Sequence, residues 1–184
     1  MAAPTTDDSR RVRDATPADG AACAAIYVPY VTDTAITFEA APPSAEQMAS
    51  RIATAVERHA WLVLEASGRV VGYAYGGVFN ARAAYRWSCE VSVYCERARR
   101  RTGAGRMLYE ALFARLAARG YRVAAAGMTL PNDASVGLHR AMGFEPVGTF
   151  RRIGYKHGSW HDVAWVQRTL GDGAAASEPP AEPR

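Results

Sequence analysis

Arginines and two glycines gather in one stretch of the chain, Arg99–Arg106, which reads RRRTGAGR. The stretch lies between a segment typical of a strand and the start of a strong helical pattern. The first amides of a helix have no partner within it and carry partial positive charge, so they favour an anion. Glycines at 103 and 105 remove Cβ atoms that would keep a phosphate from the backbone. The stretch indicates a phosphate or pyrophosphate site, with a solvated basic loop and a nucleic-acid-binding patch as alternatives.

Two known phosphate-binding patterns do not fit this stretch. No Lys-Ser or Lys-Thr pair follows the glycines, as a P-loop requires, and Leu108 stands where a dinucleotide fingerprint has its third glycine. The net charge of +4 is also small for a protein that neutralises many nucleic-acid phosphates. A single anionic ligand is therefore the interpretation that the stretch favours.

A carboxylate, Glu90, lies in the middle of the segment WSCEVSVYC, which has the composition of a strand. Strand alternation gives this segment one polar and one apolar face. The polar face holds Ser88, Glu90, Ser92 and Tyr94, and the opposite face holds Cys89, Val91, Val93 and Cys95. Glu90 can be a general base, and a solvent-facing strand glutamate is the alternative.

The segment KHGSWHD invites a metal interpretation through His157, His161 and Asp162. Histidines four residues apart suit zinc on a helix, but Gly158-Ser159 and the β-rich flanks favour a turn. We therefore expect no metal, and we expect Trp160 to brace the substrate end or a subunit contact.

The elements that must position these groups are read from caps and periodicity. After a short strand at RVRD, Thr16 followed by Pro17 predicts a helix start, and Pro29 should end or kink that helix. Ser44 and Gln47 form a capping-box pattern for a second helix that runs to about Arg58.

The middle and end of the chain alternate strands and helices. WLVLEASGRVVGYAYGGVF predicts a hairpin around Ser67-Gly68. A helix follows the arginine-glycine stretch, with leucines at 108, 112 and 116 and a C-terminal cap at Gly120. A strand, a short helix and two closing strands complete the order β-α-α-β-β-β-α-β-α-β-β. This order predicts an α/β (α+β) fold, a mixed sheet flanked by helices.

The chain of 184 residues suits one domain, which we place at 11–170. Residues 1–10 are expected to be a disordered lead and 171–184 a disordered tail, since the tail has no apolar anchor beyond alanine. No secretory signal opens the sequence and no apolar run has membrane-spanning length. The three cysteines have no metal-ligand spacing. We expect a cytoplasmic protein with reduced thiols.

The stretch VYCERARRRTGAG resembles the acetyl-CoA pyrophosphate loop of the GCN5-related N-acetyltransferases (GNAT), in which Arg100, Gly103 and Gly105 match the pattern Arg/Gln-x-x-Gly-x-Gly/Ala. The segments NARAAYRW, LPNDASVGLH, MGF and GYKHGSWHDV are similar to the phosphinothricin N-acetyltransferase branch, in order and spacing. The similarity covers about 12–170. It implies the GNAT fold, a mixed and mostly antiparallel sheet with a splay between its middle strands.

This resemblance implies that acetyl-CoA is the co-substrate. The pantetheine arm would bond to the backbone in the splay, and the loop would wrap the pyrophosphate. The implied cofactor-binding residues are Val93, Tyr94 and Cys95 on the strand, Arg100, Arg101, Thr102, Gly103, Ala104, Gly105 and Arg106 in the loop, and Asn132, which can also be a plain helix cap.

The resemblance also assigns acid–base residues. An amine must lose its proton before it attacks a thioester, and Glu90 aligns with the family's general base. His139 matches a histidine proposed to assist, and Tyr109 stands where related enzymes protonate the leaving thiolate. Core packing is the alternative for both. Attack is expected to be direct, in a ternary complex without an acyl-enzyme.

For the acceptor, Arg82 and Tyr85 match family positions that hold acidic groups. Phe38 would wall the same pocket, with a plain core residue as the alternative. Asn80 replaces a lysine of the herbicide-detoxifying members, so methionine sulfoximine or sulfone gains ground over phosphinothricin as the acceptor. The expected partners are a small amino-acid-like substrate and a second copy in a homodimer, with no nucleic acid and no membrane.

Three alternatives stay open. Within the class, the acceptor can be a protein N-terminus or another small amine. Outside it, the chain can be a non-catalytic acyl-CoA sensor. It can also be an RNA-binding module, although the arginine cluster has no adjacent platform of stacking aromatics.

Overall fold

Strands and helices follow one another in the predicted order. The computed structural model describes residues 10–99, 102–171 and 182–183. Within these ranges the elements are β1 (Arg10–Asp14), α1 (Gly20–Asp33), α2 (Ala45–Arg58), β2 (Trp61–Ala66), β3 (Arg69–Val78), β4 (Ser88–Cys95), α3 (Ala104–Ala118), β5 (Val123–Thr129), α4 (Asp133–Ala141), β6 (Glu145–Lys156) and β7 (Ser159–Thr169). Most of the expected lead and tail lies outside the described residues, and so do Arg100 and Arg101.

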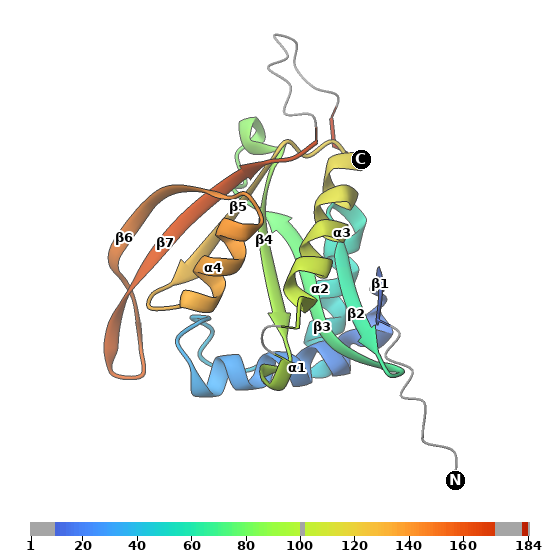
Figure 1. The fold of residues 1–184 in the computed structure, drawn as a ribbon, viewed down its shortest axis with the longest axis horizontal. Coiled ribbons are helices and arrows are strands. Elements are labelled where there is room, and N and C mark those ends of the chain that lie inside the picture. Colours follow the sequence, from blue (N-terminus) through green and yellow to red (C-terminus); the bar gives the residue numbers. More distant parts are fainter. Residues whose placement is uncertain (1–9, 100–101, 172–181, 184) are drawn as a thin grey trace.

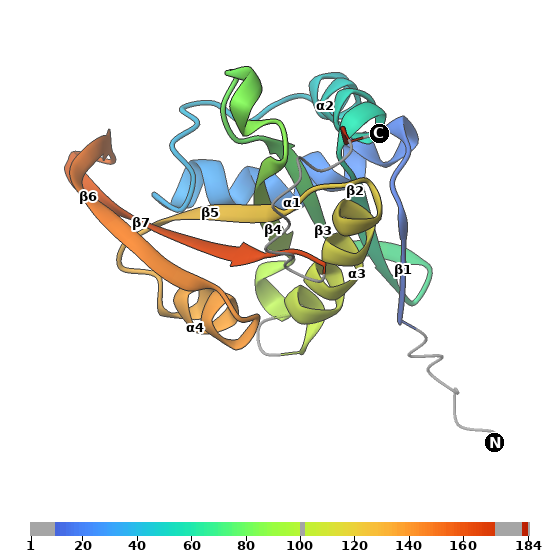
Figure 2. The ribbon, with the colours of Figure 1, turned by 90° about the horizontal axis from the view of Figure 1, so that it is seen from above.

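One sheet of seven strands carries the fold, in the order β1-β2-β3-β4-β5-β7-β6 (Figure 1). All neighbouring pairs are antiparallel except β4 with β5. Figure 2 shows α1 and α2 on one face of this sheet and α3 and α4 on the other. The predicted mixed sheet flanked by helices is confirmed.

Strand alternation divides the core between the two faces. In β2, Leu62 and Leu64 join the cluster under α3, while Trp61 and Val63 join the cluster under α1 and α2. The predicted leucine stripe of α3 is completely buried in the first cluster, at positions 108, 112 and 116. The regular period of two therefore builds two apolar layers from one set of strands.

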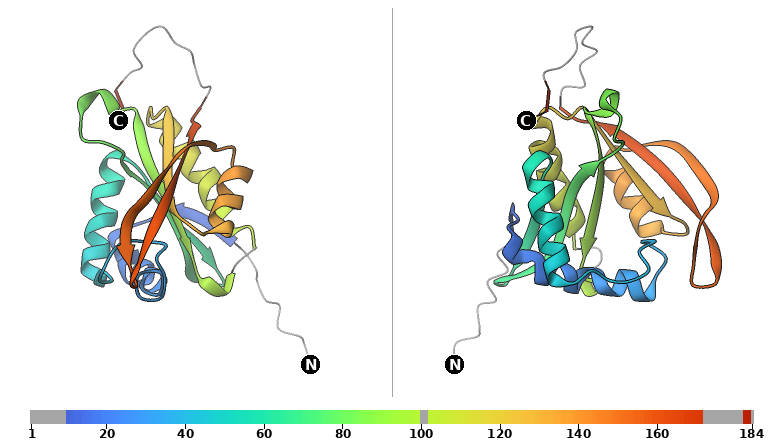
Figure 3. Two further views of the ribbon diagram at one scale, coloured as in Figure 1. Left: turned by 90° about the vertical axis from the view of Figure 1, so that its left-hand side faces the viewer. Right: turned by 180° about the vertical axis from the view of Figure 1, so that it is seen from behind.

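The middle strands β4 and β5 separate at one residue. β4 pairs with β3 from Cys89 to Cys95, but with β5 only through Ser88, Cys89 and Glu90. β5 nevertheless stays paired with β7 as far as Thr129. Two views show the resulting divergence of β4 from β5 (Figures 1 and 3). The splay between the middle strands is confirmed, and it begins directly after Glu90.

The capping box predicted for α2 is confirmed, and of the end or kink expected at Pro29 the end is wrong. Ser44 and Gln47 cap α2 reciprocally, at 3.2 and 2.9 Å. Pro29, however, does not end α1, which continues to Asp33. Tertiary contacts hold the turn beyond the proline: the Tyr30 hydroxyl donates to the carbonyl of Cys95, and Lys156 Nζ donates to that of Val31. These bonds offset the amide that a proline lacks.

Candidate active site

The backbone of β4 alternates between its two neighbours. The Glu96 amide, directly after β4, donates to the carbonyl of Val71 in β3 at 2.9 Å. Glu96 and Val71 are therefore a hydrogen-bonded pair of the antiparallel ladder. In an antiparallel ladder, bonded and non-bonded pairs alternate. Register then directs the backbone groups of Tyr94 at Tyr73 of β3, and those of Val91, Val93 and Cys95 toward β5.

The splay leaves part of this edge open. Beyond Glu90, no strand among the described residues pairs with β4 on the β5 side. Val93 therefore presents its amide and carbonyl to the gap, whereas the Cys95 carbonyl already accepts from the Tyr30 hydroxyl at 2.6 Å. The alternation supports backbone contacts from Val93 and Cys95 in the gap, but not from Tyr94. Half-buried Tyr94 instead packs its ring edge-on to Tyr27 and Tyr30.

The two glycines of the loop do different jobs. Gly103 caps the N-terminus of α3 at φ +81°, a left-handed conformation that favours glycine, and nothing lies near a Cβ there. A Cβ on Gly105 would lie 2.9 Å from Cδ2 of Leu138, so this glycine lets α3 approach α4. Within the described residues no side chain caps α3, so its first amides are left for a ligand.

The remaining loop residues are held by local bonds. Arg10 donates to the carbonyl of Thr102 at 2.6 Å, and the Thr102 hydroxyl donates to that of Arg99 at 2.9 Å. Ala104 is buried as the first residue of α3. Exposed Arg106 lies 3.9 Å from Glu110 and keeps most of its hydrogen-bonding capacity.

Glu90 is the last β4 residue paired with β5, and it is half-buried. Its partner in β3 is Gly77, which has no side chain to cover the carboxylate. Burial raises the pKa of Glu90. A carboxylate with a raised pKa, at the point where the sheet opens, has the properties of a general base.

Tyr109 and His139, predicted separately, meet in the structure. The Tyr109 hydroxyl lies 2.9 Å from His139 Nε2, and both residues are buried. His139 Nδ1 lies 2.8 Å from the carbonyl of Ser135, which can only accept. Burial lowers the pKa of His139, so the ring is neutral with its proton on Nδ1, and Tyr109 donates to Nε2.

Two other predicted residues have structural explanations. The Asn132 side chain accepts from the Ser135 amide at 3.2 Å, as a helix cap does, which leaves its amide nitrogen for a ligand. Burial raises the pKa of the Cys95 thiol to about 11, so it stays protonated near neutral pH. A protonated thiol is a poor nucleophile.

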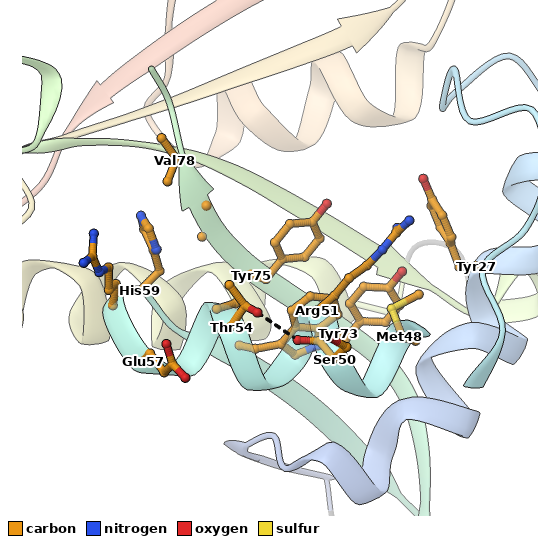
Figure 4. A pocket seen from close by; sticks show the side chains of 15 residues that line it. Tyr27, Met48, Ser50, Arg51, Thr54, Glu57, His59, Tyr73, Tyr75 and Val78 are labelled. Carbon is orange, nitrogen blue, oxygen red and sulfur yellow. Dashed lines mark hydrogen bonds between the residues drawn. The ribbon is translucent and has the colours of Figure 1, made fainter. Parts of the chain in front are cut away.

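A pocket of about 600 Å³ lies between α2 and β3 on the face of the sheet that carries Glu90. Figure 4 shows Tyr27, Arg51 and Tyr75 with their polar ends on the same side. Tyr75 stacks on Trp61, and burial raises its pKa, with a smaller contribution from the charge of Glu90. Sequence analysis missed these residues, although Tyr73 and Tyr75 alternate on β3 toward this face.

The predicted acceptor residues divide into two places. Phe38 lies in the loop 34–44, whereas Arg82 and Tyr85 lie in the loop between β3 and β4, at the opposite end of the sheet (Figure 1). Asn80 accepts from the Arg82 amide at 3.0 Å and so shapes that second loop.

The histidines of KHGSWHD hold backbone rather than one another. His157 Nε2 lies 3.2 Å from the carbonyl of Thr34, and His161 Nε2 lies 3.0 Å from that of Lys156. Asp162 accepts from the Arg152 amide at 2.8 Å. Among the described residues, no group of three metal-ligating side chains is found.

None of the described helices has both the length and the apolarity to cross a bilayer.

Comparison with known proteins adds an independent line of evidence. Residues 12–165 match the family model of the acetyltransferase (GNAT) domain. Phosphinothricin N-acetyltransferase of Streptomyces viridochromogenes is 39% identical over 173 residues, 94% of this chain and 91% of that protein. The L-methionine sulfoximine/L-methionine sulfone acetyltransferase of Pseudomonas paraeruginosa is 36% identical, over 88% of this chain and 95% of that protein.

A solved structure shares the whole architecture. It is a GNAT superfamily phosphinothricin acetyltransferase from Sinorhizobium meliloti in complex with AcCoA. The TM-score is 0.87 at 37% sequence identity, and the match covers 94% of each chain.

Glu90→Gln should separate stability from activity. Burial raises the pKa of Glu90 in the folded protein, so the ionised carboxylate costs stability above that pKa. The variant should melt higher than the wild type at pH 8 in thermal denaturation, and the difference should vanish below about pH 4. Turnover should fall roughly 10²–10⁴-fold, the range for loss of a general base, with the acid limb of the pH–rate profile removed. An acid limb that persists in the variant would rule Glu90 out as the base.

Proposed function

The chain belongs to the GNAT acetyltransferase family, and on that premise we propose that it transfers the acetyl group of acetyl-CoA to the amine of a small amino-acid-like acceptor. The observation that carries the proposal is that β4 leaves β5 directly after Glu90. This geometry puts an unpaired backbone edge and a carboxylate with a raised pKa beside one another.

Residues around the splay have complementary roles in binding. The open groups of Val93 and Cys95 would bond the pantetheine arm as a further strand would. The unpaired amides at the start of α3, with Arg106, would bind the pyrophosphate. Arg100, Arg101 and Asn132 stay assigned to the cofactor by the family resemblance. Acetyl-CoA supplies the acetyl group as a thioester.

Glu90 would remove the proton that makes the acceptor amine nucleophilic, directly or through water. The amine nitrogen then forms the C–N bond as the C–S bond breaks, and the departing thiolate takes a proton. Because Cys95 stays protonated, a covalent acetyl-cysteine is disfavoured and direct attack is supported. Phe38, Arg82 and Tyr85 stay proposed acceptor residues.

Tyr109 is the candidate proton donor to the thiolate, with His139 as its partner. The phenol belongs to the apolar cluster under α3, and Cys95, beside the gap, packs against the same cluster. Its proton is directed at His139 Nε2 in this structure, so donation to the thiolate requires the hydroxyl to turn. His139 would hold the phenol in position between turnovers.

We propose a homodimer that forms through β6. This strand is at the edge of the sheet and carries large apolar side chains, each more than half exposed: Val147, Phe150, Ile153 and Tyr155. An exposed apolar edge strand is otherwise an aggregation hazard, which a second copy removes.

The free cysteines, at 23, 89 and 95, support a location in the reducing cytoplasm.

The nature of the acceptor is tested by a thiol-release assay with acetyl-CoA. The panel contains methionine sulfone, methionine sulfoximine, phosphinothricin, plain amino acids and a short peptide. We expect the first two to have the highest kcat/KM, because Asn80 supplies no positive charge for the phosphinate. Asn80→Lys should shift the kcat/KM ratio toward phosphinothricin. Preference for the peptide would instead support acetylation of protein N-termini. If none of the acceptors in the panel causes thiol release, the proposal is refuted.

Tyr109→Phe tests the proton donor. Removal of the hydroxyl leaves His139 Nε2 without its donor in a buried site, which should cost about 1–3 kcal/mol in chemical denaturation. If the phenol protonates the thiolate, kcat should fall at least about tenfold with the KM for acetyl-CoA little changed. Normal turnover at a temperature where the variant is folded would make Tyr109 a packing residue.

The dimer is tested by Ile153→Glu, which adds charge to the exposed edge without disturbing the core. Light scattering should show a dimer for the wild type and a monomer for the variant. A wild-type monomer at about 10 µM would rule out the dimer, since interfaces of ordinary size usually bind more tightly than this. A dimer that survives the substitution would place the interface elsewhere.

A further inference from the structure

The loop 34–44, between α1 and α2, is held in place by side chains from three different elements. It contains no helix or strand, yet Tyr27 of α1, Arg51 of α2 and Lys156 of β6 all bond to it. A loop without regular structure does not need so many distant partners for connection alone.

The strongest of these bonds is an ion pair. Arg51 Nη1 and Nη2 donate to the two carboxylate oxygens of Glu39, at 2.7 and 3.0 Å. The Tyr27 hydroxyl donates to the same carboxylate at 3.1 Å and lies 2.6 Å from the hydroxyl of Thr37. The bond from Arg51 lowers the pKa of Glu39. A bidentate pair of this kind fixes direction as well as distance.

The tip of the β6–β7 hairpin holds the other side of the loop. Lys156 Nζ donates to the carbonyl of Val31, in the last turn of α1, at 2.7 Å and to that of Thr37 at 2.8 Å. His157 lies 3.2 Å from the carbonyl of Thr34. Charge at a helix C-terminus and two backbone bonds therefore anchor the loop to the hairpin.

Phe38 lies between these two anchors. Its ring packs so closely on Gly154 of β6 that a Cβ there would come within 2.1 Å of a ring carbon. The ring is 6.2 Å from that of His161, yet Phe38 is 41% exposed. The ring therefore contacts β6 on one side and is open to solvent on the other.

We propose that Glu39 and Arg51 are positioning residues for the acceptor: their ion pair holds loop 34–44 so that Phe38 is preformed as one wall of the acceptor site. The inference rests on the proposed acetyl transfer. Both Tyr27 and Arg51 line the pocket between α2 and β3, so the ion pair joins the loop to the face that carries Glu90. Ordering a loop during binding weakens affinity, and an ion pair that orders it beforehand avoids that loss.

Three variants test this role: Glu39→Gln, Arg51→Gln and the reversed pair Glu39→Arg with Arg51→Glu. Each single variant should raise the KM for the acceptor about tenfold, which corresponds to about 1.4 kcal/mol. The kcat and the KM for acetyl-CoA should change less than about twofold. The reversed pair should recover most of the lost affinity, because it restores the bidentate bond.

Asp14→Asn is the matched control. Arg115 of α3 also holds Asp14 of β1 with two bonds, at 3.1 and 3.2 Å, and neither residue lines the pocket between α2 and β3. Its loss should leave the KM for the acceptor unchanged. Hydrogen exchange should rise at 34–44 in the single variants alone and return to the wild-type rate in the reversed pair.

The outcomes separate this inference from the function on which it rests. An active wild type whose single variants keep a normal acceptor KM overturns the positioning role, and so does a reversed pair that recovers nothing. A wild type that acetylates no small amine overturns the proposed function. Unchanged exchange at 34–44 overturns the ion pair as the element that orders the loop, whatever the activity.

Discussion

The parting of β4 from β5 is the constraint on which the rest of this structure depends. Two strands that separate leave main-chain groups without partners, and buried groups of that kind are costly unless something bonds them. Here the separation begins after Glu90 and continues to the end of β4, so the opening stretches toward the start of α3. One irregularity in the sheet thus joins a carboxylate, an unpaired edge and a helix N-terminus.

The helices α3 and α4, on the face of the sheet opposite α1 and α2, support this opening in different ways. Gly103 caps the N-terminus of α3, and its left-handed backbone turns the chain into the helix. α4 lies close to α3 because Gly105 leaves room for Leu138. Between them, the bond from Tyr109 to His139 satisfies two buried polar side chains. Gly105 therefore lets the two helices lie close together, and the bond between Tyr109 and His139 joins them.

The order of elements could be predicted from the sequence because caps and periodicity are local. Ser44 with Gln47 and the alternation of β4 are examples. The end of α1 could not, since the bonds that carry it past Pro29 come from Tyr30 and from Lys156, more than a hundred residues away. The separation of Phe38 from Arg82 could not be predicted either, because a family resemblance assigns residues to a site without giving their positions in space. The pairing of Arg51 with Glu39 joins two elements that the sequence treats as independent.

The open edge of β4 has a consequence for how such a protein can change over time. Its amides and carbonyls belong to the main chain, so replacing Val93 or Cys95 by another residue leaves the same groups facing the gap. The loop 34–44 is held by side chains, and a single substitution can alter any of those bonds. The β4 edge of the site is thus little affected by substitutions, whereas the loop 34–44 can vary with them. A fold divided in this way can keep one donor molecule while its descendants acquire different acceptors.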